Sequence, residues 1–229
     1  MRRLLYVPII HEEADLGSAA LSVVQESATL FGTSSWQLHR EAVGKFWESV
    51  ATYLRSLDPS RLKVYQDGLP ADGVLGRRIV TEAARKGSKN YRLLLELLDS
   101  GAKLCKTEDA GLLWQERENI LSMAGPGPTS GEVPHLAAEQ YRRQRDDMME
   151  ARDKFIAQTI GATLKEEDLG VLFLGAYHNV VFRLPQDIHA QAVKDPELVR
   201  AYFAELLAGH DDRRLEELAT RLAAPVLPI

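Results

Sequence analysis

The sequence predicts an α/β fold, with a mainly parallel β-sheet of about four or more strands and helices on both faces. Short apolar runs alternate with longer amphipathic stretches along the 229 residues. The first and last of these runs, 4–10 and 170–177, are apolar at consecutive positions, which is typical of strands covered on both faces. Strands joined by helices pair mainly in parallel, and the chain is rich in helices.

The elements follow one another in a regular order, and we expect one α/β domain over residues 1–229. Strands are predicted at 4–10, 61–66, 102–106 and 170–177. Helices are predicted between and after them, at 17–32, 34–57, 72–87, 88–101, 109–125, 135–164, 195–209 and 211–224. The segment 125–134, GPGPTSGEVP, is too rich in glycine and proline for regular structure and is either a linker or a flap.

Composition favours a cytoplasmic protein and excludes several classes. The net charge of -5 gives no general attraction to nucleic acid or to anionic lipid, so we expect neither as a partner. The single cysteine, Cys105, cannot form an internal disulfide and is expected to be a buried, inert thiol. The apolar run after Arg2 and Arg3 is short and has no small-residue cleavage site, so it indicates a strand instead of a signal peptide. No apolar stretch approaches the length of a membrane span.

Polar side chains follow each predicted strand. His11 and Glu13 follow the first strand, Asp67 the second, Glu108 the third and His178 the fourth. Since parallel strands end at one edge of a sheet, we expect these groups to converge there. As an alternative to a shared site, each carboxylate could cap or begin the helix that follows it. The two histidines are less easily explained in that way, because both end buried-type strands. The other four, His39, His135, His189 and His210, are expected at the surface of helices or loops.

Two imidazoles with carboxylates suit a divalent metal ion such as Zn, Mn, Fe or Co. The candidate ligands are His11, Asp67, Glu108 and His178. His178 is also a candidate acid/base group, and Glu13 is a candidate general base. Arg152 lies beside the apolar stripe of the helix at 135–164, so it either faces solvent or needs a carboxylate or a substrate anion as its partner. In the last case it would stabilise an anion during catalysis.

Four short motifs together resemble a known superfamily. They are VPIIHEEAD at the first strand, VYQDG at the second, EARDKFIAQTI on the long helix and LGAYH at the fourth strand. Their order is similar to that of the superfamily of TraB-like proteins, TIKI metalloproteases, ChaN-like haem-binding proteins and erythromycin esterase-like enzymes. The usual glycine-threonine before the first histidine is replaced by Pro8, Ile9 and Ile10, and Asp67 stands where a glutamate is usual. Members of this superfamily differ in activity, so a shared fold does not settle function.

These observations lead to three hypotheses. The first is a metal-dependent hydrolase-like protein that acts on a small molecule or a peptide. The second is a non-catalytic protein that binds a small ligand or a cofactor such as haem in the same pocket. The third is an interaction protein or homo-oligomer, because the C-terminal APVLPI is an apolar tail that would dock on a partner, on a second copy or on its own domain.

Overall fold

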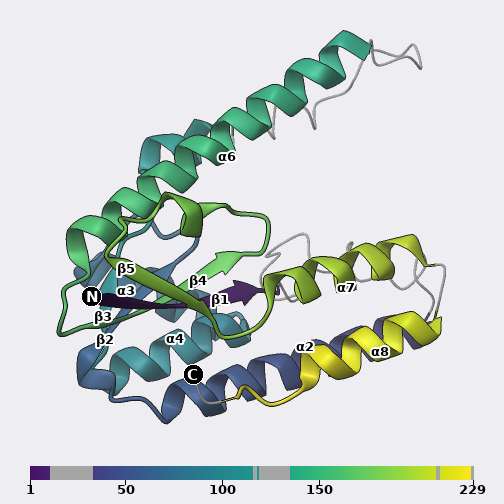
Figure 1. The fold of residues 1–229 in the computed structure, drawn as a ribbon, viewed down its shortest axis with the longest axis horizontal. Helices are drawn as coiled ribbons and strands as arrows, with labels where there is room; N and C mark the ends of the chain where they lie inside the picture. The colour runs from purple at the N-terminus through teal and green to yellow at the C-terminus, as the bar shows by residue number, and fades with distance from the viewer. Residues whose placement is uncertain (11–32, 116–117, 119–134, 210–211, 228–229) are drawn as a thin grey trace.

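The predicted α/β class is confirmed by a computed structural model, which describes residues 1–10, 33–115, 118, 135–209 and 212–227 (Figure 1). All strand pairs are parallel, and the sheet has the order β3-β2-β4-β1-β5. The strands are β1 (Arg2–Ile9), β2 (Leu62–Gln66), β3 (Lys103–Cys105), β4 (Leu169–Gly175) and β5 (Ile188–Ala192). β4, which comes late in the chain, therefore lies between β1 and β2, which come early.

Helices connect the strands and cover both faces of the sheet. They are α2 (Thr33–Arg55), α3 (Gly73–Arg85), α4 (Lys89–Asp99), α6 (His135–Thr163), α7 (Pro196–Ala208) and α8 (Asp212–Ala223). Residues 110–115 are helical as well, and a short 3-10 helix, η3, spans Val180–Arg183. The predicted helix at 17–32 and the predicted linker or flap at 125–134 lie outside the described residues.

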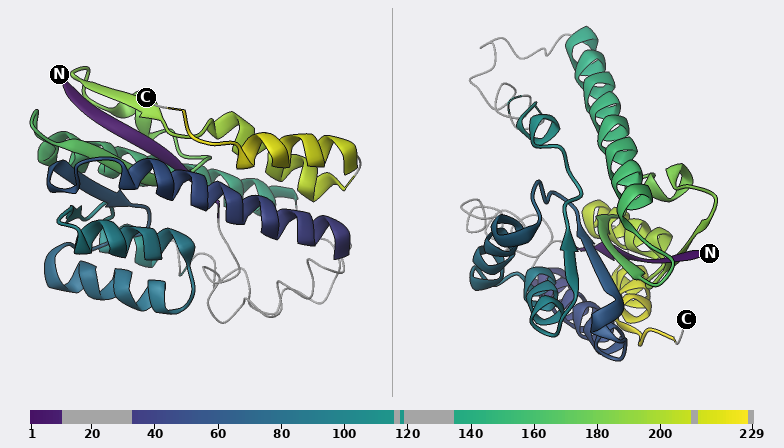
Figure 2. Two further views of the ribbon diagram at one scale, coloured as in Figure 1. Left: turned by 90° about the horizontal axis from the view of Figure 1, so that it is seen from below. Right: turned by 90° about the vertical axis from the view of Figure 1, so that its left-hand side faces the viewer.

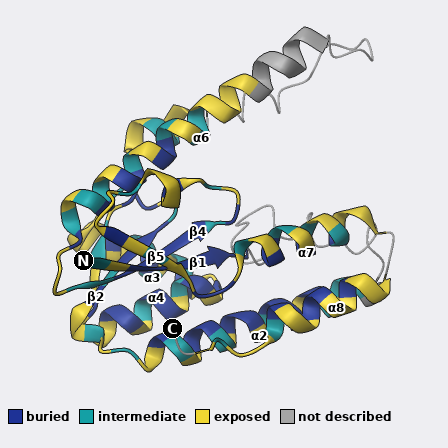
Figure 3. Cartoon of the chain, in the orientation of Figure 1, coloured by how far each residue is buried: buried dark blue, intermediate teal, exposed yellow. Residues whose placement is uncertain are grey.

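Alternation along β1 separates two apolar cores. Leu5 and Val7 face the core shared with α2, α4, α7 and α8, while Leu4 and Tyr6 face the core shared with α6. The three central strands, β1, β2 and β4, are buried along most of their length, as Figure 3 shows. Burial on both faces explains why the first and last predicted strands carry uninterrupted apolar runs.

The long helix α6 covers one face with its C-terminal half. Ile156, Ala157 and Ile160 pack in the core on that face, and the N-terminal half extends beyond the sheet (Figures 1 and 2). The predicted boundaries of this helix, 135–164, agree closely with the observed His135–Thr163. None of the described helices is both long enough and apolar enough to cross a membrane.

Of the histidines predicted at the surface, His39 is buried, whereas His189 is exposed as predicted but does not lie on a helix or loop. His189 lies on β5, a strand missed because IHAQA is short and half polar, as an edge strand with one exposed face is. His39 is buried, with 6% of its surface exposed, because α7 covers this part of α2. Its Nδ1 lies 3.0 Å from the Tyr202 hydroxyl, and its ring stacks between Trp36 and Tyr202. Only the packing of α7 on α2 reveals this burial.

The helix ends follow ordinary capping chemistry. Asp195 caps α7 by accepting a hydrogen bond from the backbone N–H of Glu197 at 2.9 Å. Gly209 ends the same helix with a φ of 61°, a left-handed conformation that favours glycine. These caps place the start of α7 immediately after β5, close to the carboxyl edge of the sheet.

We expect the fold to lose stability in mild acid because of His39. Burial lowers the pKa of His39 from 6.5 to about 4. Between pH 6.5 and about pH 4, His39 is therefore protonated in the unfolded chain but neutral in the folded chain. The contribution of His39 to stability is complete above pH 6.5 and is lost as the pH falls through this range. The loss amounts to about 3 kcal/mol. Urea unfolding of His39→Gln, compared with the wild type across this range, measures it.

The matched control is His189→Gln, which removes an exposed histidine from β5. We expect this variant to keep the acid dependence of the wild type. An equally steep loss of stability in His39→Gln would contradict the assignment.

Candidate functional site

The order of the strands brings the ends of β2 and β4 together at the carboxyl edge of the sheet. In the parallel register Gln66 lies beside Phe173, and the backbone N–H of Asp67 donates to the Phe173 carbonyl at 2.8 Å. Asp67 therefore follows β2 directly beside the last residues of β4. The chain after β3 is tied to the same place, because the backbone N–H groups of Thr107 and Glu108 both donate to the Leu69 carbonyl, at 3.0 and 3.1 Å.

Arg152 joins two of the predicted site residues. From α6 its guanidinium donates to Asp67 Oδ1 at 2.7 Å and to both oxygens of Glu108, at 2.7 and 3.3 Å. The side chains are 9%, 15% and 0% exposed respectively, so these charges are held away from bulk water. Burial raises the pKa of Glu108, and the hydrogen bonds and charge of Arg152 oppose that shift. The sequence left solvent, a carboxylate or a substrate anion as alternatives for Arg152. In the structure its guanidinium contacts the carboxylates of Asp67 and Glu108.

His178 is held by a carboxylate on each side. Its Nδ1 lies 2.5 Å from Asp153 Oδ1, and its Nε2 lies 3.5 Å from Asp67 Oδ2. Asp153 is itself fixed, because its other oxygen accepts a hydrogen bond from the backbone N–H of Asn179 at 2.7 Å. Burial lowers the pKa of His178, but the Asp153 hydrogen bond and the charge of Asp67 outweigh it, and the net shift is upward. The imidazole ring thus has a fixed orientation and lies between two carboxylates.

The turn that carries His178 is anchored through its backbone. Gly175 N–H donates to Asp67 Oδ2 at 3.2 Å, and the Gly175 carbonyl accepts from the Tyr6 hydroxyl at 3.3 Å and from His178 N–H at 3.2 Å. Arg200 of α7 donates to the Ala176 carbonyl. These contacts tie the turn to Tyr6 of β1, to Asp67 after β2 and to Arg200 of α7.

Gly175 lies beside the two candidate ligands Asp67 and His178. A β-carbon at this position would lie 3.4 Å from His178 Cδ2 and 3.5 Å from Asp67 Oδ2. These are ordinary contact distances, so alanine fits at this position.

The structure brings four of the six predicted site residues into one cluster: Asp67, Glu108, Arg152 and His178. The other two, His11 and Glu13, lie outside the described residues. Within the described ranges, no three His, Cys, Asp or Glu side chains come together in a way that could hold a metal ion. Among the predicted metal ligands that the structure describes, Asp67 and His178 face each other.

Sequence reasoning assigned no role to Asp153, Tyr6 or Arg200. For Asp153 a signal was present in the sequence, because this residue follows Arg152 in EARDKFIAQTI, one of the four motifs that carry the resemblance. The contacts of Tyr6 and Arg200 are with backbone carbonyls, which leave no pattern in the sequence. Cys105 lies at the end of β3 and is half-buried, and burial raises the pKa of its thiol.

No family model matches the chain, and neither a curated protein nor a solved structure matches it. The functional argument therefore starts from the geometry of the cluster formed by Asp67, Glu108, Arg152, Asp153 and His178, which we call the edge cluster.

Removing the arginine from the edge cluster should be costly. Arg152→Met leaves the carboxylates of Asp67 and Glu108 together without their shared cation, which should lower the free energy of unfolding by about 3–5 kcal/mol. Urea unfolding at pH 7 measures the loss. The double variant Arg152→Met with Glu108→Gln should recover part of the lost free energy of unfolding, because one of the two unpaired buried charges is then removed.

Arg55→Met is the matched control, since Arg55 pairs with Glu96 at 2.7 Å on the surface, where both side chains are about half exposed. Such a pair contributes at most about 1 kcal/mol. Equal losses in the two arginine variants would show that the edge cluster is not held by Arg152.

Proposed function

We propose that this protein is a metal-dependent hydrolase with its reaction centre at Asp67 and His178. The observation that carries the proposal is the 3.5 Å distance between Asp67 Oδ2 and His178 Nε2. Two ligands of one tetrahedral metal ion, each about 2.1 Å from it, lie about 3.4 Å apart. The two donor atoms are therefore spaced as neighbouring ligands of one ion would be.

The surroundings of His178 support the same role. A histidine that binds a metal ion through Nε2 usually bonds a carboxylate through Nδ1, and Asp153 occupies that position here. Asp67 is oriented in a similar way, since Arg152 holds its Oδ1 and leaves Oδ2 directed at His178. Arg152 and Asp153 are thus positioning residues, and Glu108 neutralises the second side of the Arg152 guanidinium.

Further ligands would have to come from residues outside the described ranges, and His11 remains the candidate, because β1 ends beside Gly175 of β4. A divalent ion bound at this place would lower the pKa of a water molecule. Hydrolysis then joins the water oxygen to the electrophilic carbon of the substrate, breaks the bond from that carbon to the leaving group, and transfers a water proton to the leaving group. Glu13 remains the candidate base for that proton.

The motif order supports the proposal as well. The residues that resemble the TraB, TIKI, ChaN-like and erythromycin esterase-like superfamily include Asp67, the Arg152–Asp153 pair, Gly175 and His178, and all of these lie in or beside the edge cluster. Membership of that superfamily is part of the proposal.

Metal analysis of the purified protein tests the proposal. We expect a divalent ion to be bound in the wild type and to be lost in Asp67→Asn combined with His178→Gln. Asp153→Asn should weaken metal binding by about 10- to 100-fold, because it removes the group that orients His178. His189→Gln serves as the control, since His189 lies near the amino end of β5, beside Arg3.

Hydrolysis of a panel of esters and peptides tests the catalytic half. We expect activity that a chelator abolishes and the same metal restores. A wild-type protein that holds no divalent ion would overturn the metal assignment. One that holds the ion and hydrolyses no substrate would favour a binding protein instead.

A further inference from the structure

Basic side chains surround a cavity at the amino edge of the sheet, the edge opposite the edge cluster. The cavity has a volume of about 280 Å³. It lies where β2 and β3 begin and where the segment 164–168 leads from α6 into β4. The charged residues that line it are Arg61, Lys63, Lys103, Lys165, Glu167 and Asp168.

The sheet places two of these lysines side by side. Lys63 of β2 and Lys103 of β3 are partners in the parallel register, so their side chains lie on the same face of the sheet. Two like charges at neighbouring positions repel each other. The pairing of these strands therefore costs stability unless negative charge lies beside the two ammonium groups.

Asp168 supplies part of that negative charge. Its Oδ2 lies 2.9 Å from Lys63 Nζ, and the two side chains are only 11% and 12% exposed. The same oxygen accepts a hydrogen bond from the backbone N–H of Lys165 at 3.1 Å. Burial raises the pKa of Asp168, but the hydrogen bonds from Lys63 and Lys165 and the charge of Lys103 outweigh it, and the net shift is downward. Lys63 and Asp168 thus form a fixed and neutral wall of the cavity.

The end of α6 beside the cavity is neutralised as well. The last carbonyl groups of a helix carry partial negative charge and would repel an anion. Here Lys63 donates to the Thr163 carbonyl, and Arg2 donates to the carbonyls of Gly161 and Leu164 at 2.6 and 2.9 Å. The helix end therefore adds little negative charge to the cavity.

Three basic side chains of the cavity then remain with a single carboxylate, that of Glu167. Arg61 donates through Nε to the backbone carbonyl of Glu167 at 3.0 Å, so this contact does not use the carboxylate. Lys103 and Lys165 are exposed, and neither ammonium group makes a hydrogen bond or an ion pair with another described residue. The cavity thus has an excess of positive charge in a chain whose net charge is -5.

The charges just outside the cavity leave this excess in place. A neighbouring cavity is lined by two acidic residues and two basic groups, which are Asp58, Glu166, Arg3 and the amino group of Met1. Glu166 pairs with that amino group at 3.0 Å. Asp58 interacts with Arg61 through its charge, and Arg3 offsets Asp58 in the balance of charge.

We propose that the cavity between Arg61, Lys103 and Lys165 binds a phosphate group, either as inorganic phosphate or as the phosphate monoester of a small molecule. A phosphate monoester carries about 1.5 to 2 negative charges near pH 7, which matches the excess of positive charge. Its oxygens accept charge-assisted hydrogen bonds from guanidinium and ammonium groups. The site lies at the edge of the sheet opposite Asp67 and His178, so it goes beyond the proposed function and does not depend on it.

Volume and net charge favour a small phosphate over a polyanion. Pockets for drug-sized ligands have volumes of about 300–1,000 Å³, and this cavity lies just below that range. The net charge of -5 repels nucleic acid and anionic membranes as a whole, whereas it leaves a single phosphate group free to reach a local basic site.

Isothermal titration calorimetry of the full chain with inorganic phosphate and with glycerol phosphate, near neutral pH and at constant ionic strength, tests the proposal. We expect saturable binding with one site. Lys103→Gln combined with Lys165→Gln should weaken binding by about ten-fold or more, because two charge-assisted hydrogen bonds are lost. Glu167→Gln should strengthen binding by about two- to five-fold, because it removes the carboxylate that repels the phosphate.

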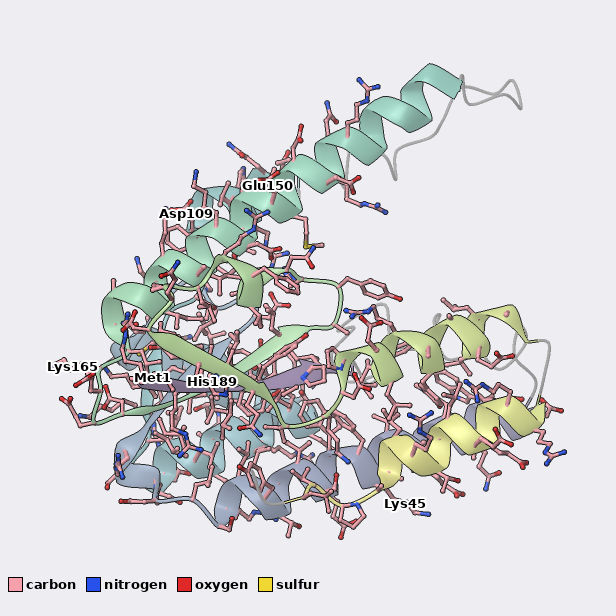
Figure 4. All side chains as sticks on the ribbon, viewed as in Figure 1. Met1, Lys45, Asp109, Glu150, Lys165 and His189 are labelled. Atoms are coloured by element: carbon pink, nitrogen blue, oxygen red, sulfur yellow. The ribbon has the colours of Figure 1, made fainter. Side chains whose placement is uncertain are left out.

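The matched control is Lys45→Gln, which removes the same charge from an exposed position on α2. Figure 4 shows Lys45 and Lys165 far apart in the molecule. Asp67→Asn with His178→Gln should bind phosphate as the wild type does, which separates this site from a metal ion at the edge cluster. Because Lys103 and Lys165 are exposed, their replacement removes little packing, and urea unfolding should show a folded double variant.

Absence of saturable binding, an equal loss in Lys45→Gln, or equally tight binding of acetate would overturn the proposal. So would binding to anionic vesicles or to RNA, without binding of either small probe, that the double lysine variant abolishes. Tighter binding of glycerol phosphate than of inorganic phosphate would support the site and identify a phosphorylated small molecule as its ligand. The reverse order would support the site and identify the free ion.

Discussion

The position of β4 between β1 and β2 is the constraint on which the candidate site depends. β4 pairs in parallel with both neighbours, so its carboxyl end lies between theirs. This pairing places Asp67, at the end of β2, next to Gly175, at the end of β4. Had β1 and β2 been neighbours, the residues after β4 would have ended elsewhere along the edge. The chemistry thus follows from the order of the strands.

Electrostatics then decides how the buried charges are arranged. Asp67, Glu108 and Asp153 bring three carboxylates to one place, and Arg152 brings one guanidinium. Buried charges need partners, so Arg152 takes two carboxylates and the third is shared by His178 and a backbone N–H. The remaining excess of negative charge around Asp67 and His178 is what a divalent cation would neutralise.

Helix α6 connects the core, the edge cluster and η3. Ile156 and Ile160 bury its apolar stripe on the sheet, one turn before them Arg152 and Asp153 reach the edge cluster, and Glu150 approaches η3. A single helix therefore orients His178 through Asp153 and also contacts η3 through the pair of Glu150 and Arg183. Movement of this helix would disturb both at once.

The fold could largely be predicted from the sequence, and the site only in part. The parallel α/β class followed from uninterrupted apolar runs separated by helices, and the predicted strands agree with β1 to β4. β5 was not predicted, because a short, half-polar edge strand has no strong hydrophobic pattern in the sequence. The convergence of Asp67, Glu108 and His178 followed from the rule that parallel strands end at one edge. The burial of His39 did not follow, because its own helix pattern carries no information about α7.

By itself, the sequence determined which segments are buried strands, which edge of the sheet is polar, and which residue types stand there. These are local properties, because burial on one or both faces imposes a period on neighbouring residues. Only the tertiary structure decided that Arg152 pairs with Asp67 and Glu108, and that Asp153 orients His178. Arg152 and Glu108 are 44 residues apart in the chain, and Gly175 and Asp67 are 108 apart. Partners at such separations are selected by the desolvation of buried charge once the strands have paired, and no local period records that selection.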